Sequence, residues 1–416
     1  MKSFLKVTIS SALLTLLRIG SGFIVAKAVA VYAGPGGMAM LGQLQNMIAA
    51  LNGVVTAPVG NGLIRYTAEH HANGIEACAP WWRACTRWLA FVFVATVPIA
   101  LFFTNSISEW IFGSSNYAWL IVIAILALPL AAINTLLASV TNGLQQYKRF
   151  IGLSMVSVVI ATAVMLSLVV TLKVNGALMA AALFSGISGT VMIIGTIRQP
   201  WFRLRYWIGN VDKVKMRGAG AYVAMAAASA LCVPISLMLV RNLLVQKLGW
   251  SVAGQWQAVY KISEVYLGVI TMALSTYYLP RLSAVSGFDA IKAEIWSITR
   301  FVMPIVCVLA IIVYCLRDVA ISLLFTEQFR AARDLFAVQL LADVVKILSW
   351  LFAFPMLSRG AAKWFIGTEV IFSLSLPALA LLFVDKFGAN GANLAYLVNY
   401  ILYFAFVYKT LKYFSR

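Results

Sequence analysis

The chain has 416 residues, of which 62% are hydrophobic and only 11% are charged, with a formal net charge of +19. Soluble globular proteins carry about 25% charged residues, so this composition excludes that class. Repeated apolar runs of roughly 20 residues instead predict an all-α polytopic membrane protein. The weak alternating pattern of an outer-membrane barrel is not seen in the sequence. Five cysteines show no metal-ligand spacing and require no disulfide.

The N-terminal stretch resembles a signal peptide only at first sight. Lys2 and Lys6 precede an apolar segment that runs from about residue 7 to residue 33. That segment is too long for the apolar part of a signal peptide, and it contains Arg18 and Lys27. We interpret it as a retained first transmembrane helix.

Twelve segments are long enough to span a bilayer, six in each half of the chain. This number predicts two six-helix lobes, residues 1–197 and 219–416, joined by a basic amphipathic cytoplasmic linker over residues 198–218. The expected spans are 7–33, 39–64, 86–104, 118–143, 150–172, 177–197, 219–241, 254–279, 300–316, 333–357, 364–384 and 391–411.

The linker combines six basic residues with Trp201, Phe202, Tyr206 and Trp207. Aromatic residues among cations are found in single-stranded nucleic-acid sites. In a polytopic membrane protein, a segment lying among the lipid head groups is the better interpretation.

Basic residues are distributed unevenly between the two sides of the expected membrane. The even-numbered connections and both termini contain 21 of them, whereas the odd-numbered connections contain seven. The positive-inside rule therefore places both termini in the cytoplasm. The excess charge is explained by topology and by attraction to anionic lipids, without nucleic-acid binding. The basic residues assigned to odd-numbered connections are Lys173, Arg241, Lys247, Arg317, Arg330, Arg333 and Lys386.

Short motifs recur between the two halves. Residues 42–45 (GQLQ) recur at 254–257 as GQWQ, and residues 175–177 (NGA) recur at 390–392. Because each half has an even number of expected spans, the halves run in the same direction and form a parallel internal repeat.

Charged residues within the expected spans are the strongest functional signal, because a charge in the bilayer is costly and usually faces a cavity. Helical spacing places Gln257, Lys261 and Glu264 on one face of the segment 254–279. The segment 333–357 repeats this arrangement with Asp343 and Lys346. A purely structural alternative pairs Lys261 with Glu264 and Asp343 with Lys346. Arg18 has no such partner on its own helix.

These positions predict a cavity for a phosphate-bearing or otherwise anionic substrate, since arginine and lysine both bind phosphate. Arg65 and Arg281 have an alternative role as head-group anchors at helix ends. No catalytic or metal-binding residues are predicted, and the sequence contains no P-loop. The predicted cationic residues are Arg18, Lys27, Lys261, Lys346, Arg65 and Arg281. The predicted polar contacts to a glycan are Gln43, Asn46 and Gln257. The carboxylates predicted to balance charge or to couple to an ion are Glu264, Asp343 and Glu369.

Several stretches resemble a known family: GPGG at 34–37, WQAVYKISEVYL at 256–267, YLPRLS at 278–283 and RDLFAVQLLADVVK at 333–346. They resemble the Wzx-type polysaccharide flippases, in the branch with the O-antigen and lipid III translocases, over essentially the whole chain. The resemblance implies twelve helices around a central cationic cavity, within the multidrug/oligosaccharidyl-lipid/polysaccharide exporter superfamily.

The same resemblance implies a function, which is the flipping of an undecaprenyl-pyrophosphate-linked oligosaccharide to the periplasmic leaflet of a Gram-negative inner membrane. It implies a transporter rather than an enzyme, with no cofactor and with coupling to a proton or sodium gradient as an option. The implied partners are the lipid-linked substrate, membrane lipids, and other glycan-assembly proteins such as a polymerase and a chain-length regulator.

Three alternatives remain at this point. A cation-coupled drug exporter of the same superfamily would have a cavity dominated by carboxylates. A membrane glycan polymerase or ligase would need a sizeable periplasmic loop with catalytic arginines, and the longest expected loop, 317–332, is modest. A non-transporting scaffold would leave the intramembrane charges without a role.

Overall fold

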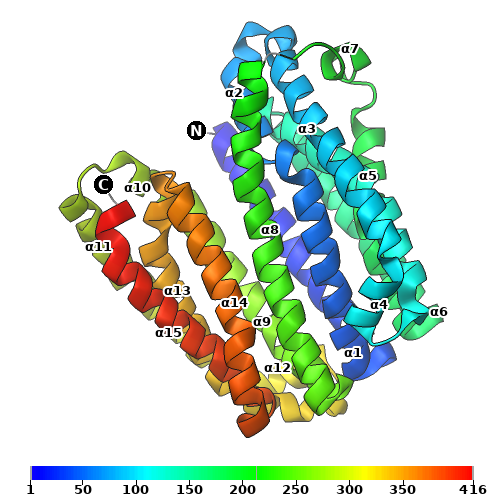
Figure 1. Ribbon diagram of the computed structural model, residues 1–416, viewed down its shortest axis with the longest axis vertical. Coiled ribbons are helices and arrows are strands. Elements are labelled where there is room, and N and C mark those ends of the chain that lie inside the picture. Colours follow the sequence, from blue (N-terminus) through cyan, green and yellow to red (C-terminus); the bar gives the residue numbers. More distant parts are fainter. Residues whose placement is uncertain (1, 212, 415–416) are drawn as a thin grey trace. The chain divides into compact units, whose positions relative to one another are not determined.

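The computed structural model describes residues 2–211 and 213–414, and every regular element within these ranges is helical (Figure 1). Nine of the described helices are long and apolar enough to cross a membrane. The expected class, an all-helical polytopic membrane protein, is therefore confirmed.

Two of these nine elements are long and each contains two of the expected spans. Residues Ser10–Asn73 and Tyr147–Thr196 form the two, with kinks at Gly34 and Lys173. Gly34 has φ 64° and is followed by Pro35, which cannot donate a helical hydrogen bond. The expected span 254–279 is not among the nine, because Gln255, Gln257, Lys261 and Glu264 lower its hydropathy.

The chain forms two compact units. The first contains residues 1–33 and 43–234, and the second contains residues 34–42 and 235–416. Helices of the first unit are α1 (Lys2–Thr56, apart from 34–42), α2 (Asn61–His70), α3 (Ile75–Phe102), α4 (Thr104–Phe112), α5 (Ala118–Gly143), α6 (Tyr147–Thr196), α7 (Leu204–Trp207) and the first part of α8 (Lys213–Leu248). Those of the second unit are the rest of α8, α9 (Trp250–Ala273), α10 (Leu279–Ala284), α11 (Phe288–Cys315), α12 (Arg317–Leu324), α13 (Phe336–Ser358), α14 (Ala362–Phe387) and α15 (Ala389–Phe414).

The boundaries of the units differ from the expected lobes 1–197 and 219–416. The first part of α8 stays with the first unit because it packs against helices there. Trp88 Nε1 on α3 donates a hydrogen bond of 2.9 Å to the Met216 carbonyl, and Gly53 on α1 approaches Ala230 closely. Residues 34–42 join the second unit because they pack against α9.

The expected amphipathic linker 198–218 is not one helix. Its first part is irregular except for the four residues of α7. Trp201 and Tyr206 are only 1% and 7% exposed, and they pack in a core with Trp82 of α3. These two rings therefore face the protein interior, and the expectation that the linker as a whole lies among lipid head groups stays a prediction.

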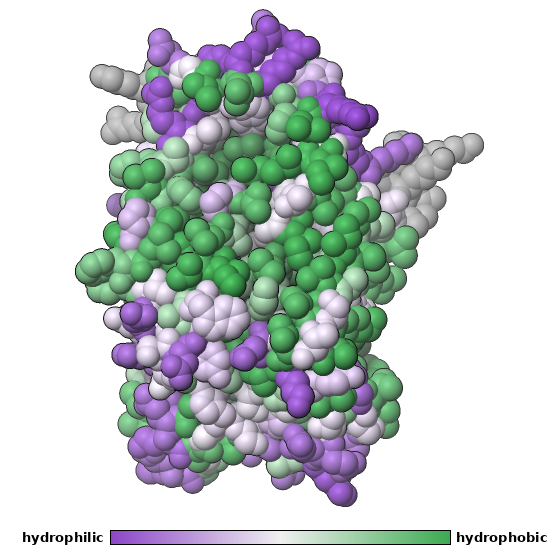
Figure 2. Space-filling model, turned by 90° about the vertical axis from the view of Figure 1, so that its right-hand side faces the viewer, coloured by the Kyte–Doolittle hydropathy of each residue, from purple (hydrophilic) through white to green (hydrophobic). Residues whose placement is uncertain are grey.

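Large apolar side chains are exposed on many of the long helices, among them Phe91 and Val94 on α3 and Ile194 on α6. Figure 2 shows one face of the molecule, where apolar residues form a broad band between hydrophilic ends. This is the surface expected of helices that contact lipid tails.

Residues with positive φ recur in pairs along the chain. Gly34 (φ 64°) and Gly249 (φ 85°) are 215 residues apart, and so are Gln145 (φ 58°) and Gly360 (φ 63°). Lys173 has φ 51° and ψ −124°, and Gly388, also 215 residues later, has φ 56° and ψ −138°. The chain therefore breaks its helices at equivalent places in both halves.

Gly254 of α9 provides a test of the packing of residues 34–42. A Cβ atom at Gly254 would lie 1.8 Å from the Pro35 carbonyl oxygen, whereas a Cβ atom at Gly268 of the same helix would meet nothing within 4 Å. We expect Gly254→Ala to lower the thermal unfolding midpoint of the purified protein, because overpacking costs about 1–3 kcal/mol.

Gly268→Ala is the matched control, and it should leave the midpoint unchanged or raise it, since alanine favours a helix. Equal midpoints for the two variants in a thermal scan would contradict the close approach.

Candidate functional site

The second unit contains a group of polar and charged side chains next to an apolar helical core. The core is built from α9, α11, α13 and α15 around buried residues such as Leu267, Ile295, Phe352 and Leu411. We call the polar group the polar cluster. It consists of Arg241, Gln257, Lys261, Glu264, Tyr266, Gln339, Asp343, Lys346, Glu369, Tyr396 and Tyr400.

Lys346 of α13 lies at the centre of the polar cluster. Its Nζ atom donates a 2.8 Å hydrogen bond to the Tyr396 hydroxyl of α15. The same atom lies 4.8 Å from the ring centre of Trp350 and 5.5 Å from that of Tyr400. Aromatic faces attract cations, and the effect grows when the cation is desolvated. Three carboxylates, those of Asp343, Glu264 and Glu369, attract the ammonium group electrostatically.

Asp343 is fully buried and is held by neutral donors. The Tyr266 hydroxyl donates to it at 2.5 Å and Gln339 Nε2 at 3.0 Å. Asp343 and Lys346 form no direct ion pair within the described residues, because each is hydrogen-bonded to another side chain. The Asp343 carboxylate still attracts the Lys346 ammonium group, so the structural alternative for these two residues remains open. The helix geometry gives each side chain a better partner on a neighbouring helix.

Lys261 and Glu264 do form the predicted ion pair, at 2.9 Å, one turn apart on α9. Their side chains are 35% and 46% exposed. An exposed pair of this kind stabilises a fold by only about 0–1 kcal/mol, so both groups can exchange partners at little cost.

Arg241 also belongs to the polar cluster, although the sequence predicts that it lies in a connection between helices. The helix α8 continues past it to Leu248, and Arg241 is completely buried. It donates a hydrogen bond to Gln257 Oε1, and its guanidinium lies 5.6 Å from the Trp256 ring. The apolar residues 243–245, which follow Arg241 after the single polar residue Asn242, are the sequence signal that the helix continues.

The remaining predicted residues lie elsewhere. In the second unit, Arg281 pairs with Glu294 of α11 at 2.9 Å and is outside the cluster. The other five predicted residues belong to the first unit. There Arg65 pairs with Glu69 at 2.7 Å, Arg18 is exposed on α1, Gln43 is buried, and Lys27 and Asn46 are half-buried. The structure thus brings together Gln257, Lys261, Glu264, Asp343, Lys346 and Glu369.

The chain is similar to known polysaccharide-handling proteins. A family model described as "Polysaccharide biosynthesis protein" matches residues 84–334. The lipid III flippase of Escherichia coli (strain K12) is 30% identical over 410 residues, which cover 97% of this chain and 97% of that protein. The lipid III flippase of Shigella flexneri matches with the same identity and coverage.

The chain belongs to the Wzx-type polysaccharide flippase family. The resemblance seen in the sequence is therefore confirmed. Solved structures agree on the fold of this superfamily. The inward-facing multidrug resistance MATE transporter of the MOP superfamily has a TM-score of 0.75 at 12% identity, covering 96% of this chain and 98% of that one. The lipid II flippase MurJ, in its inward closed conformation, has a TM-score of 0.71 at 14% identity, covering 98% and 87%.

Replacing Asp343 tests the buried part of the polar cluster. Asp343→Asn places an amide donor against the Tyr266 hydroxyl or Gln339 Nε2, which both donate to the carboxylate. We expect the thermal unfolding midpoint to fall, because an unsatisfied buried polar group costs about 1–3 kcal/mol.

The control is Asp385→Asn, which removes an exposed carboxylate paired with Lys247 at 3.0 Å and should change the midpoint little. If both variants unfolded at the wild-type temperature, the contacts assigned to Asp343 would be wrong.

Proposed function

We propose that this flippase carries an undecaprenyl-pyrophosphate-linked oligosaccharide from the cytoplasmic to the periplasmic leaflet by alternating access. The observation that carries this proposal is Lys346, a half-buried lysine that is hydrogen-bonded to Tyr396 and attracted by three carboxylates, in a chain similar over its full length to lipid III flippases. Its setting would be a bacterial inner membrane, with both termini in the cytoplasm.

The proposed architecture is twelve membrane-spanning helices in two six-helix lobes, residues 1–197 and 219–416, related by a parallel repeat. Counting α1 and α6 as two spans each, on either side of their kinks, and adding α9 gives twelve. The paired positive-φ positions support the repeat. Gly176 and Gly391 support it as well, because each packs its Cα against the carbonyl of the residue eight positions earlier, Leu168 or Phe383.

In the proposed mechanism, cations hold the pyrophosphate and any acidic sugars. Lys261 is suited to this because its ion pair with Glu264 is half-exposed and a phosphate oxygen can replace the carboxylate. Lys346 of α13 would supply a second cation. The proposal extends to the cations Arg18, Lys27, Arg65 and Arg281 and to the polar side chains Gln43, Asn46 and Gln257. The prenyl chain stays in lipid, and the product passes to a polymerase and a chain-length regulator.

The carboxylates Glu264, Asp343 and Glu369 are proposed to couple transport to a proton or sodium gradient. Each interacts with the Lys346 ammonium group, so binding of a cation at any of them changes how tightly Lys346 is held. Coupling of this kind needs a site whose charge differs between two states.

A leaflet-resolved liposome assay with a defined lipid-linked oligosaccharide tests the cationic site. We expect Lys261→Gln and Lys346→Gln to lower the flipping rate about tenfold or more, since a hydrogen bond to a charged group contributes about 1.5–3 kcal/mol and 1.4 kcal/mol is tenfold. Arg18→Gln should act in the same direction.

Lys247→Gln is the matched control, because Lys247 has an exposed partner, Asp385, and is not in the cluster. Wild-type rates for both Lys261→Gln and Lys346→Gln, at normal protein levels, would refute the cationic site.

The same liposomes test the coupling. Imposing a pH or sodium gradient should raise the wild-type rate, and Glu369→Gln should abolish that rise while leaving the rate without a gradient measurable. Glu327→Gln serves as control, since this carboxylate is 88% exposed in the second unit. A gradient response that persists in Glu369→Gln, Glu264→Gln and Asp343→Asn alike would remove these residues from coupling.

A further inference from the structure

The segment of residues 198–211 is fastened to the first turns of α3 in the first unit. Arg83 Nη2 donates to the Arg205 carbonyl at 2.6 Å, and Arg87 Nη2 donates to the Gly209 carbonyl at 3.1 Å. The rings of Trp82 and Trp207 stack at 4.9 Å. These contacts hold the segment in one place on α3 and create a pocket beneath it.

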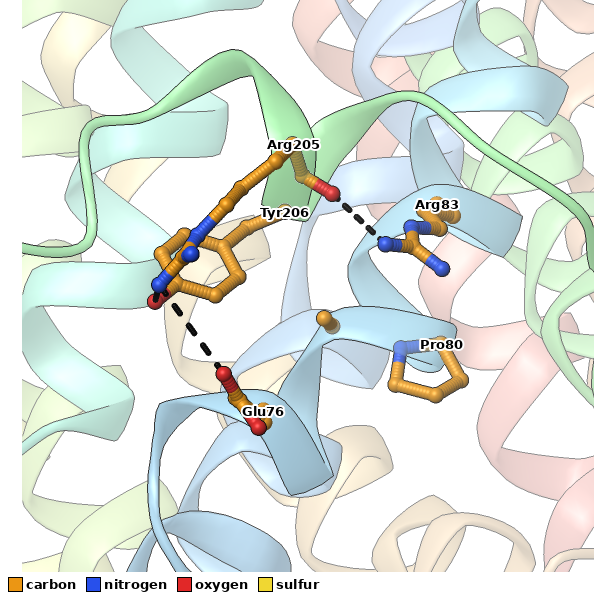
Figure 3. A pocket seen from close by; sticks show the side chains of 6 residues that line it. Glu76, Pro80, Arg83, Arg205 and Tyr206 are labelled. Atoms are coloured by element: carbon orange, nitrogen blue, oxygen red, sulfur yellow. Dashed lines mark hydrogen bonds and ion pairs between the residues drawn. The ribbon is translucent and has the colours of Figure 1, made fainter.

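The pocket has a volume of about 230 Å³ and carries three charged side chains. Figure 3 shows Arg205 and Arg83 on opposite sides of the space, with Glu76 at its lower edge. The lining residues are Glu76, Ala79, Pro80, Arg83, Arg205 and Tyr206. Two guanidinium groups and one carboxylate give the pocket a net charge of one positive unit.

Neither arginine is fully satisfied by the protein. The Nε atom of Arg83 is buried and has no hydrogen-bond partner among the described residues. The ion pair of Arg205 with Glu76 is long, at 3.9 Å, and the Glu76 side chain is 83% exposed. Arg205 also donates a hydrogen bond to the Tyr206 hydroxyl, and its guanidinium, like any arginine side chain, is charged at neutral pH. The donors that the pocket offers to a small anion are therefore those of the half-exposed Arg205 guanidinium, with the Arg83 guanidinium adding a second positive charge at the pocket wall.

Apolar side chains lie next to these donors in the sequence and point outward. Leu204 and Ile208, on either side of Arg205, are 77% and 67% exposed. Exposed apolar residues beside cations are typical of segments that lie at a bilayer surface, where cations contact phosphates and apolar groups contact acyl chains.

We propose that this pocket binds the head group of a monoanionic phospholipid, such as phosphatidylglycerol, and fastens the segment 198–211 to the membrane surface. Arg83 and Arg205 bind the phosphodiester, and the acyl chains lie against Leu204 and Ile208. Glu76 accepts hydrogen bonds from the head-group hydroxyls and repels a second negative charge, which selects against a pyrophosphate. The bound lipid is thus distinct from the transported substrate.

Native mass spectrometry of the full-length, delipidated protein tests this site with dioleoyl phosphatidylglycerol as the probe. The variant Arg83→Gln/Arg205→Gln should bind its first phosphatidylglycerol at least tenfold more weakly than the wild type. The variant Arg198→Gln/Arg203→Gln removes the same charge from exposed positions of the same segment and should bind like the wild type. Leu204→Ser/Ile208→Ser should also weaken binding.

Arg205→Gln alone covers the case in which the double variant fails to fold, because the hydrogen bond from Arg83 to the carbonyl of residue 205 does not need the Arg205 side chain. Equal weakening by Arg198→Gln/Arg203→Gln would mean diffuse charge attraction and would overturn the site. So would equal binding of dioleoyl phosphatidylethanolamine. Displacement of the lipid by soluble glycerophosphoglycerol at a similar concentration would mean a site for free phosphodiesters and would overturn the membrane role.

Discussion

The second unit depends on charged side chains that are wholly or partly removed from water and are held by neutral hydrogen-bond partners. Burying an unpaired cation among apolar helices is costly, so each one requires partners nearby. These partners come from different helices, and the polar contacts therefore connect α8 to α9, α9 to α13 and α13 to α15. The three hydrogen bonds that do this join Arg241 to Gln257, Tyr266 to Asp343 and Lys346 to Tyr396. These hydrogen bonds hold α9 against its neighbours, and α9 carries the half-exposed pair of Lys261 and Glu264.

The two halves of the chain share backbone features but differ in their side chains. The helix breaks at Lys173 and Gly388 have nearly the same dihedral angles, and Gln145 and Gly360 share a positive φ. Yet where α9 carries Lys261 and Glu264, the corresponding positions of α1 are Ala49 and Asn52. The repeated feature is thus the geometry of the scaffold, and the polar cluster is particular to the second half.

Family membership and class follow from the sequence because they rest on local properties. Hydropathy, helical period and the motif WQAVYKISEVYL are all visible without knowing which helices touch. The number of membrane spans is less visible in the sequence, because the chain bends at Gly34 and Lys173 without ending the helix, so that one long kinked helix stands where two were expected. The burial of two aromatic residues of the linker is likewise not visible in the sequence. Their composition suits a membrane surface, and only the neighbouring Trp82 of α3 shows that Trp201 belongs to a core.

The sequence by itself determined that this is a helical membrane protein of the flippase family and which helices carry charge, since both depend on residues close together along the chain. The tertiary structure alone decided how those charges are partnered. Asp343 accepts from Tyr266, 77 residues away, in preference to Lys346 one turn along its own helix. Arg241 is buried against Gln257 instead of lying in a connection. The reason is desolvation, because a buried charge takes the partner that packing brings to it, and packing is not a local property.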